Sequence, residues 1–475
     1  MSDARFLYED VAGYITELVD MGTLPKGARV PSLREVSQSR RVALSTAIQA
    51  YRVLEGRGVI EARPKSGYYV SNYRPITLEQ PAISRPPESA SAVAVSDIPL
   101  KLLEYGADPR LIQLGASMPS VKILAAGRLG RLLAREARTN VHKHNTYIAP
   151  KGVARLRAEI AKRAMHWGQA LSPEDIIITE GCTEALALAL RTLTQAGDTV
   201  VVESPTYFGL LQALEALDLK ALELPTDPTT GIDVAALERA LSGKNVAACL
   251  FASSFNNPLG CTMPDTKKHE ILELLASFGV PLIEDDIYGD IYFGKERPRP
   301  FATFDRNECV IYCSSFSKTL APGYRIGWIA TTHRADEILK RKFASTLCGP
   351  AVLQETIADF LASGGYEHHL RRMRSILQGN MERMIRTVEK SFPEGTRITR
   401  PSGGYVLWLE LRSKANTRAL FDAALREGIC IAPGDVFSTS GQYGNCLRLN
   451  FSQPWDLRLE RAVMRLGELA SSMTA

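Results

Sequence analysis

The chain has 475 residues, of which 45% are hydrophobic and 23% charged, and its formal net charge is +5. This length predicts about three domains, and no window approaches the roughly 18 uninterrupted apolar residues of a membrane-spanning helix. The first residues mix acids with apolar side chains and lack a basic start before an apolar run, so we expect no signal peptide. Eight cysteines without a CxxC pair predict reduced thiols and a cytoplasmic protein.

The N-terminal region is predicted to be a winged helix-turn-helix. Residues 5–21 have helical apolar spacing, and "PSLREVSQS" opens a second helix with Ser32 as N-cap and Glu35 three residues on. A third helix follows in "ALSTAIQAYRVLEGRG". Two short β segments, "VIEARP" and "GYYVSN", then form a hairpin through a turn at residues 64–67.

The positive charge is concentrated in this region. Residues 29–74 hold nine Lys or Arg and three Glu, a net +6 against +5 for the whole chain, which predicts a polyanionic partner. Short polar residues at the start of the third helix can approach base edges, and basic residues of the preceding helix and of the hairpin can hold phosphates. A solvated helical face is the alternative interpretation. The candidate DNA-binding residues are Arg34, Ser45, Thr46, Gln49, Lys65 and Gly67.

About 65 residues of this region resemble the head of the GntR family. The resemblance rests on the "PS-x-R-E" helix, the "AY-x-x-LE-x-x-G" helix and the "SGYYV" wing. It implies a double-stranded DNA operator as partner. The family usually has an arginine where this chain has Leu44, so a bidentate contact of that arginine with guanine would be missing.

Beyond the head, the composition predicts a linker and an α/β body. We expect a head over residues 1–74, a Pro-, Ser- and Ala-rich linker over 75–109 and a body over 110–475. Apolar runs such as "DIIIT", "TVVVE", "AACLFAS" and "PLIEDD" alternate with helical stretches, which favours a parallel sheet covered by helices. From about residue 350, helices followed by "TRITRPSGGYVLWLEL" and "CLRLNF" predict a small α+β domain.

The stretch "SSFSKTLAPGYRIGW" places Lys318 among small hydroxyl residues, with Arg325 seven positions later. A lysine that forms a Schiff base with pyridoxal phosphate (PLP) must lose its proton and meet an aldehyde. The phosphate of PLP needs hydrogen-bond donors and a cation, and a helix N-terminus after a strand also favours anions. Candidate phosphate ligands are Gly181, Cys182, Thr183, Ser315, Ser317 and Arg325.

Further residues match the remaining parts of PLP. Asp285 in "IEDDIY" can keep the pyridine nitrogen protonated, and Tyr288 and Asn257 can reach the 3-oxygen of the ring, while Tyr207 can stack on it. Singly, each residue has an ordinary explanation, such as a turn or a strand cap. In this order over about 170 residues they resemble the fold-type I aminotransferases, across residues 110 to 470.

That resemblance implies roles for individual residues. The catalytic group would be Lys318 as Schiff-base lysine with Asp285 and Tyr288. Tyr147 would contact the cofactor phosphate of a partner subunit, which implies a homodimer, and Arg448 would bind the ligand carboxylate. The chain departs from the family at Ser117-Met118-Pro119, where Gly-x-Pro is usual, and at Cys182-Thr183, where Ser-Gln is frequent.

A GntR-like head joined to an aminotransferase-like body is the layout of the MocR subfamily of transcriptional regulators, which the chain resembles end to end. We therefore expect a PLP-dependent DNA-binding regulator that senses PLP or an amino compound through an aldimine at Lys318. The alternatives are a working aminotransferase with an accessory head and a DNA-binding protein with an inactive body. No metal site is expected, and His368 and His369 are expected on an exposed helix.

Overall fold

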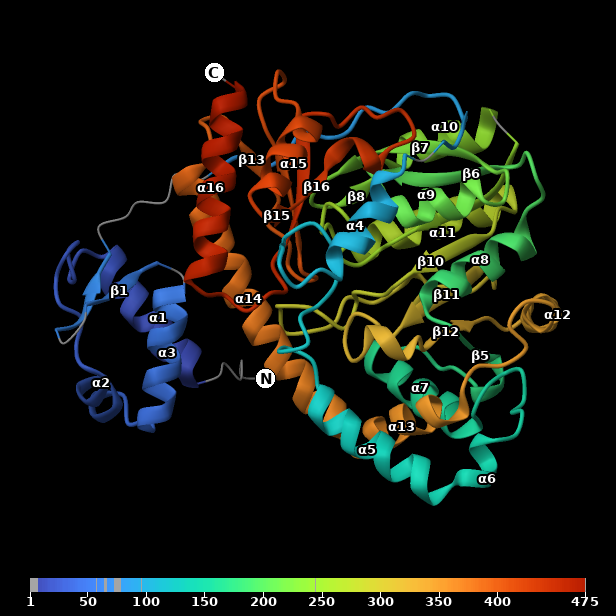
Figure 1. Ribbon diagram of the computed structural model, residues 1–475, viewed down its shortest axis with the longest axis horizontal. Coiled ribbons are helices and arrows are strands. Elements are labelled where there is room, and N and C mark those ends of the chain that lie inside the picture. Colours follow the sequence, from blue (N-terminus) through green and yellow to red (C-terminus); the bar gives the residue numbers. More distant parts are fainter. Residues whose placement is uncertain are drawn as a thin grey trace. The chain divides into compact units, whose positions relative to one another are not determined.

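The computed structural model describes residues 7–56, 58–63, 66–71, 78–94, 96–243 and 245–474. The chain divides into two compact units, whose elements are labelled in Figure 1. One unit contains the N-terminal region to Leu78 together with Gln378–Phe392 and Trp455–Glu468, and the other contains the rest of the chain. None of the described helices is both long and apolar enough to cross a membrane.

The N-terminal region forms three helices and a hairpin, which confirms the predicted winged helix-turn-helix. Ser32 caps the second helix as expected: Glu35 N donates to Ser32 Oγ at 3.2 Å, and Ser32 N donates to a Glu35 carboxylate oxygen. Apolar side chains from every element, including Val11, Tyr51 and Val70, bury a common core. The elements are α1 (Leu7–Asp20), α2 (Leu33–Ser39), α3 (Leu44–Gly56), β1 (Ile60–Arg63) and β2 (Gly67–Val70).

The body is built on a mainly parallel sheet with strand order β3-β7-β6-β9-β10-β11-β12-β5, with β8 beside β7 (Figure 1). The apolar runs in the sequence form strands of this sheet, as predicted: three of them form inner strands, and "DIIIT" forms the edge strand β5. Neighbours from β7 to β11 are parallel, whereas β12 is antiparallel to both β11 and β5. The strands are β3 (Ser91–Ala92), β5 (Ile176–Thr179), β6 (Thr199–Ser204), β7 (Lys220–Asp227), β8 (Gly231–Ile232), β9 (Val246–Phe251), β10 (Leu282–Asp285), β11 (Val310–Ser315) and β12 (Gly327–Ala330).

Helices bury both faces of this sheet, which explains why its strands are continuous apolar runs. Val200 and Val202 of β6 pack with α8, α9 and α12, whereas Val201 packs on the other face with α10 and α11. Helices α5, α7 and α13 pack beside β5 and β12. These helices are α5 (Ala126–Thr139), α7 (Ala154–Ala164), α8 (Cys182–Leu193), α9 (Phe208–Glu215), α10 (Val234–Gly243), α11 (Asp265–Phe278), α12 (Ala335–Phe343) and α13 (Ala351–Ala362).

The C-terminal part has its own antiparallel sheet of order β13-β14-β17-β16, as predicted from its two apolar runs. A two-residue parallel pair, β4 with β15, joins the start of the body to this part. The elements are β4 (Ile112–Gln113), β13 (Arg397–Ile398), β14 (Val406–Glu410), β15 (Ile429–Cys430), β16 (Ala432–Pro433), β17 (Cys446–Asn450), α14 (Gly365–Ser391), α15 (Thr417–Arg426) and α16 (Leu457–Thr474).

The described residues of the predicted linker contact the body. Ser84 N donates to Thr226 O at 3.4 Å, and β3 pairs with β7. Helix α4 (Ile98–Gly106) follows, with Pro99 in its first turn. Main-chain hydrogen bonds therefore hold this segment against the sheet at several points.

Candidate cofactor site

Lys318 and Asp285 lie at one edge of the large sheet. They come just after β11 and at the end of β10, two neighbouring parallel strands whose carboxyl ends meet there. The Lys318 amine donates to Ser117 O at 2.7 Å. Burial, with Arg448 nearby, lowers the pKa of Lys318 to about 8, although Asp285 opposes this shift. A substantial fraction of the amine is thus neutral near pH 8 and able to attack an aldehyde.

Asp285 is a partly buried carboxylate. Burial raises its pKa to about 6, and a hydrogen bond from Cys182 Sγ at 3.5 Å counteracts this rise. Burial also raises the pKa of the Cys182 thiol well above its ordinary value, so the thiol stays protonated and can donate. Above about pH 6 the Asp285 carboxylate is ionised and suited to pair with a protonated pyridine nitrogen.

Ser117 connects Lys318 with two tyrosines. Its carbonyl oxygen accepts a hydrogen bond from the Lys318 amine and another, at 3.3 Å, from the Tyr405 hydroxyl. Its own hydroxyl is 2.6 Å from Tyr288 Oη. Burial raises the pKa of Tyr288 to about 12, so its hydroxyl remains a neutral donor. The residue that departs from the Gly-x-Pro pattern is therefore hydrogen-bonded to the site.

An anion cradle lies at the N-terminus of α8. Gly181 caps the helix with a φ of +80°. Arg325 donates to Glu180 O at 2.9 Å and to Ser317 Oγ at 3.3 Å. A Cβ at position 181 would lie 2.4 Å from an Arg325 nitrogen, so only glycine leaves room for this approach. The helix dipole, the backbone amides of the first turn and the guanidinium together fit a phosphate group.

Arg448 of β17 is fully buried. It donates to Asn257 Oδ1 at 2.8 Å and to Gly115 O, and its guanidinium lies 5.0 Å from the centre of the Phe437 ring. Within the described part of the chain its Nε has no hydrogen-bond partner. A guanidinium held this way retains donor capacity for a carboxylate.

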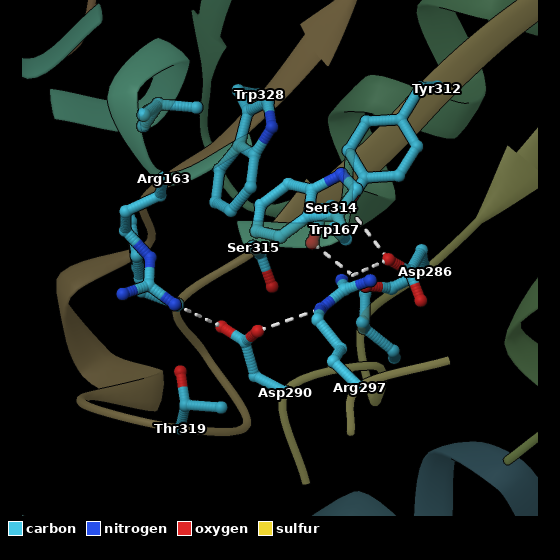
Figure 2. Close-up of a pocket in the computed structure, with 13 residues that line it drawn as sticks. Arg163, Trp167, Asp286, Asp290, Arg297, Tyr312, Ser314, Ser315, Thr319 and Trp328 are labelled. Carbon is cyan, nitrogen blue, oxygen red and sulfur yellow. Dashed lines mark hydrogen bonds and ion pairs between the residues drawn. The ribbon is translucent and has the colours of Figure 1, made fainter. Parts of the chain in front are cut away.

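Of the other candidate residues, Tyr207 lies in this cluster and Tyr147 does not. Tyr207 is half-buried just before α9, and the charges of Arg448, Asp285 and Arg325 act on its hydroxyl, which places it in the same cluster. Thr183 is exposed in the first turn of α8, and Ser315 lines a small cavity with Asp290 (Figure 2). The structure does not bring Tyr147 into the cluster: its side chain is 85% exposed after α6 (Val141–His144).

Sequence reasoning missed several residues of the site. Gly115 and Tyr405 were not among the candidates, and the prediction that His369 lies on an exposed helical face is wrong. Its side chain is 5% exposed, whereas His368 is exposed as expected. The signal for His369 was present, because Tyr366, Leu370 and Met373 mark the buried stripe of α14 on the same helical face.

Three of the five described candidate residues of the head, Arg34, Ser45 and Gly67, are exposed. Arg34 is exposed on α2, and Ser45 is exposed in the first turn of α3. Leu44, the first residue of α3, is 46% exposed. Gly67 begins β2 with a φ of +108°, a conformation that favours glycine. Thr46 and Gln49 are half-buried on α3, and Lys65 lies outside the described residues.

Comparisons with known proteins match both parts of the chain. Residues 121–466 match the family model "Aminotransferase class I and II", and residues 7–70 match "Bacterial regulatory proteins, gntR family". The HTH-type transcriptional regulator YdcR of Escherichia coli K12 is 38% identical over 97% of this chain and 98% of its own. The regulator YjiR of the same organism is 36% identical, with the same coverage.

Among solved structures, the α-aminoadipate aminotransferase LysN of Thermus thermophilus, complexed with N-(5'-phosphopyridoxyl)-L-leucine, is 27% identical. It has a TM-score of 0.74 over 81% of this chain and 96% of its own. The sheet, the lysine after β11 and the anion cradle define a fold-type I aminotransferase domain, whose cofactor is PLP. Together with its helix-turn-helix head, the chain belongs to the MocR subfamily of GntR-type transcriptional regulators.

Proposed function

We propose that the protein regulates transcription in response to an amino compound, which it detects by exchange at Lys318. The observation that carries this proposal is the Lys318 amine, held at Ser117 O beside Asp285 and near Arg448, in a chain that also has a DNA-binding head. PLP supplies a reactive aldehyde and an electron-accepting ring when it is bound. An incoming amine that takes the place of the lysine at that aldehyde would free Lys318.

We also propose which residues would hold PLP. We propose Gly181, Cys182, Thr183, Ser315, Ser317 and Arg325 for the phosphate, with Asp285 for the ring nitrogen. We propose Tyr288 and Asn257 for the 3-oxygen, Tyr207 for stacking, and Arg448 for a ligand carboxylate. The charges of Arg325, Asp285 and Arg448 are each opposite to that of the group proposed to meet them.

A homodimer is part of the proposal. Tyr147 is 85% exposed within its own chain. A large aromatic residue exposed to this degree is suited to contact a second copy of the chain. In that arrangement each Tyr147 would contribute its hydroxyl to the phosphate of the partner's cofactor.

We also propose that the chain divides into a head over residues 1–74, a linker over 75–109 and a body over 110–475.

A working aminotransferase is the second candidate, since Lys318, Asp285 and Arg448 provide the groups that turnover requires. The test mixes PLP-loaded protein with single amino acids and 2-oxoglutarate, and follows both the absorption spectrum and the formation of glutamate. A spectral change without sustained product, accompanied by altered operator affinity, supports the regulator. Sustained turnover with unchanged operator affinity contradicts it.

Replacing Arg34 with alanine is expected to weaken DNA binding about fivefold for many sequences alike. The reason is the loss of one charge-assisted phosphate contact. The slope of log affinity against log salt concentration should also fall by about 1. Fluorescence anisotropy with labelled duplexes at several salt concentrations measures both quantities. The Arg34→Lys variant keeps the charge and should keep the slope; an unchanged slope in Arg34→Ala would show that Arg34 contacts no phosphate.

A further inference from the structure

Two side chains from the start of α14 contact the residue that follows Lys318. Tyr366 and His369 lie one helical turn apart, so they project from the same face of α14. Their exposed fractions are 2% and 5%, and that of Thr319 is 2%. His369 Nε2 lies 2.6 Å from Thr319 O, and Tyr366 Oη lies 2.8 Å from Thr319 Oγ1. Both the main chain and the side chain of Thr319 are therefore held by α14.

The partners fix the position of each proton. A carbonyl oxygen only accepts, so His369 Nε2 carries a hydrogen and donates it to Thr319 O. Burial lowers the pKa of His369, and the charges of Arg372 and His368 act in the same direction, so the ring is neutral above its ordinary pKa of about 6.5. The neutral ring of His369 therefore makes the hydrogen bond to Thr319 O at every pH above about 6.5.

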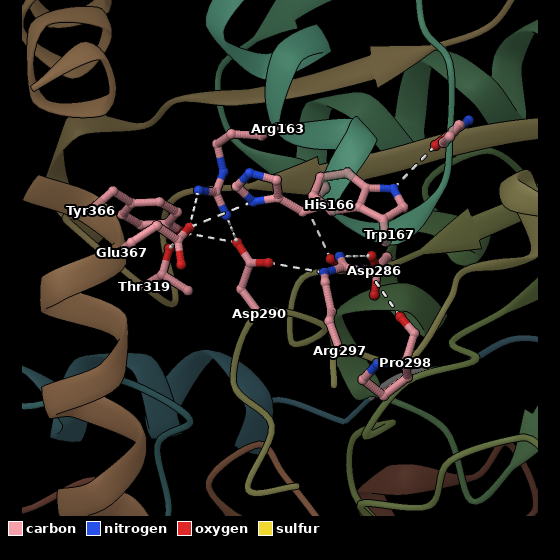
Figure 3. A network of polar contacts seen from close by, with 12 residues as sticks. Arg163, His166, Trp167, Asp286, Asp290, Arg297, Pro298, Thr319, Tyr366 and Glu367 are labelled. Atoms are coloured by element: carbon pink, nitrogen blue, oxygen red, sulfur yellow. Dashed lines mark hydrogen bonds and ion pairs between the residues drawn. The ribbon is translucent and has the colours of Figure 1, made fainter. Parts of the chain in front are cut away.

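Tyr366 extends the contact to a buried ion-pair network. Its hydroxyl is 3.0 Å from Asp290 Oδ2, and Arg163 and Arg297 reach the same carboxylate at 3.0 and 2.9 Å (Figure 3). The two guanidinium groups hold the pKa of Asp290 well below its ordinary value, so this carboxylate can only accept. Because a tyrosine hydroxyl has one hydrogen, Tyr366 donates it to Asp290 and accepts from Thr319.

The same network reaches the residue beside Asp285. Arg297 also contacts the carboxylate of Asp286, which receives the Tyr312 hydroxyl at 2.8 Å (Figure 2). The Arg374 Nε donates to Asp290 O at 2.8 Å from the next turns of α14. Neighbours of the lysine and of the ring-binding carboxylate are thus fixed by one set of side chains, much of it from α14.

We propose that Tyr366 and His369 are positioning residues for Lys318. By holding the main chain and hydroxyl of Thr319, they keep the lysine amine at Ser117 and away from water. Both hydrogen bonds are made to Thr319, so each side chain acts on the lysine through that residue. This inference rests on the proposed role of Lys318, which it deepens by identifying what holds that lysine in its reactive position.

The test follows the rate at which a visible absorption band forms when PLP is added to cofactor-free protein between pH 6.5 and 10.5. The neutral amine is the form that attacks, so the rate should rise with a midpoint near the lysine pKa of about 8. In His369→Phe, which keeps a ring but loses the donor, a less confined lysine becomes better solvated. The midpoint should move up by about one pH unit, toward the ordinary lysine value of about 10.4. Tyr366→Phe should shift it in the same direction.

Two variants serve as controls. His369→Gln retains an N–H donor and should return the midpoint to within about 0.3 of wild type, while His368→Phe, on the exposed face, should leave it unchanged. Thermal unfolding of each variant separates lost stability from lost positioning. A lower melting temperature with an unshifted midpoint in His369→Phe overturns the inference, as does a shift that Gln fails to correct. Absence of the band in wild type would instead contradict the proposed function.

Discussion

The Lys318→Ala variant is expected to bind PLP without forming the visible absorption band of a covalent cofactor. The reason is that the band requires an amine bonded to the PLP aldehyde, and Lys318 is the lysine placed beside Asp285 at the strand ends. The loss should be complete, and dialysis should remove PLP from the variant but not from wild type. The absorption spectrum before and after dialysis measures both effects. Operator affinity without ligand should stay within about threefold of wild type, whereas the response to amino compounds should disappear.

Lys268 provides a matched control for this experiment. It is fully buried, and burial lowers its pKa, but it lies on α11 and its amine donates to Arg299 O rather than to Ser117 O. Lys268→Met should keep the visible band even if the melting temperature falls. A band that persisted in Lys318→Ala would exclude this lysine as the tether.

Replacing Arg448 with methionine is expected to weaken the binding of an amino acid about a hundredfold. A bidentate contact with a carboxylate provides two charge-assisted hydrogen bonds, together about 3 kcal/mol, and every 1.4 kcal/mol is a factor of about ten. The amine formed by decarboxylation of the same amino acid has no carboxylate, so it should bind wild type and Arg448→Met with the same affinity. Titrations of the visible band with each member of the pair give the two affinities.

The paired ligands make this experiment specific. Equal weakening of the amino acid and of its amine would assign the loss to a distorted site rather than to carboxylate binding. Arg412→Met, a replacement of the same kind at an exposed arginine, should change neither affinity. The melting temperature of Arg448→Met shows how much stability is lost when the fully buried guanidinium is removed.

The strands could be predicted from their apolar runs. Because neighbouring parallel strands end at a common edge of the sheet, Asp285 and Lys318, at or just after the ends of two of them, could be expected to lie close together. That geometry brings residues 33 positions apart into one site without any knowledge of side-chain contacts. Contacts made through the main chain could not be predicted this way. The carbonyls of Gly115 and Ser117 receive Arg448 and Lys318 from far along the chain, and every residue type offers the same backbone acceptor.

The prediction that His369 is exposed was wrong for a different reason. The segment "GYEHHLRRMRS" is rich in charge, and two adjacent histidines favour an exposed helix when they are considered by composition alone. The 3.6-residue period assigns them to different faces, so one is buried and the other exposed. The period could have placed His369 inside, but its partner Thr319, 50 residues earlier, depends on the tertiary fold.

The acceptor that holds the Lys318 amine belongs to the peptide unit of Ser117 rather than to a side chain. Any residue at position 117 offers the same backbone acceptor to the lysine amine, so this contact does not depend on the side chain at that position. What the serine adds is a hydroxyl for Tyr288. Serine in place of glycine thus leaves the hydrogen-bond acceptor of the lysine unchanged. It changes only the hydrogen bonding of Tyr288, the tyrosine proposed for the 3-oxygen.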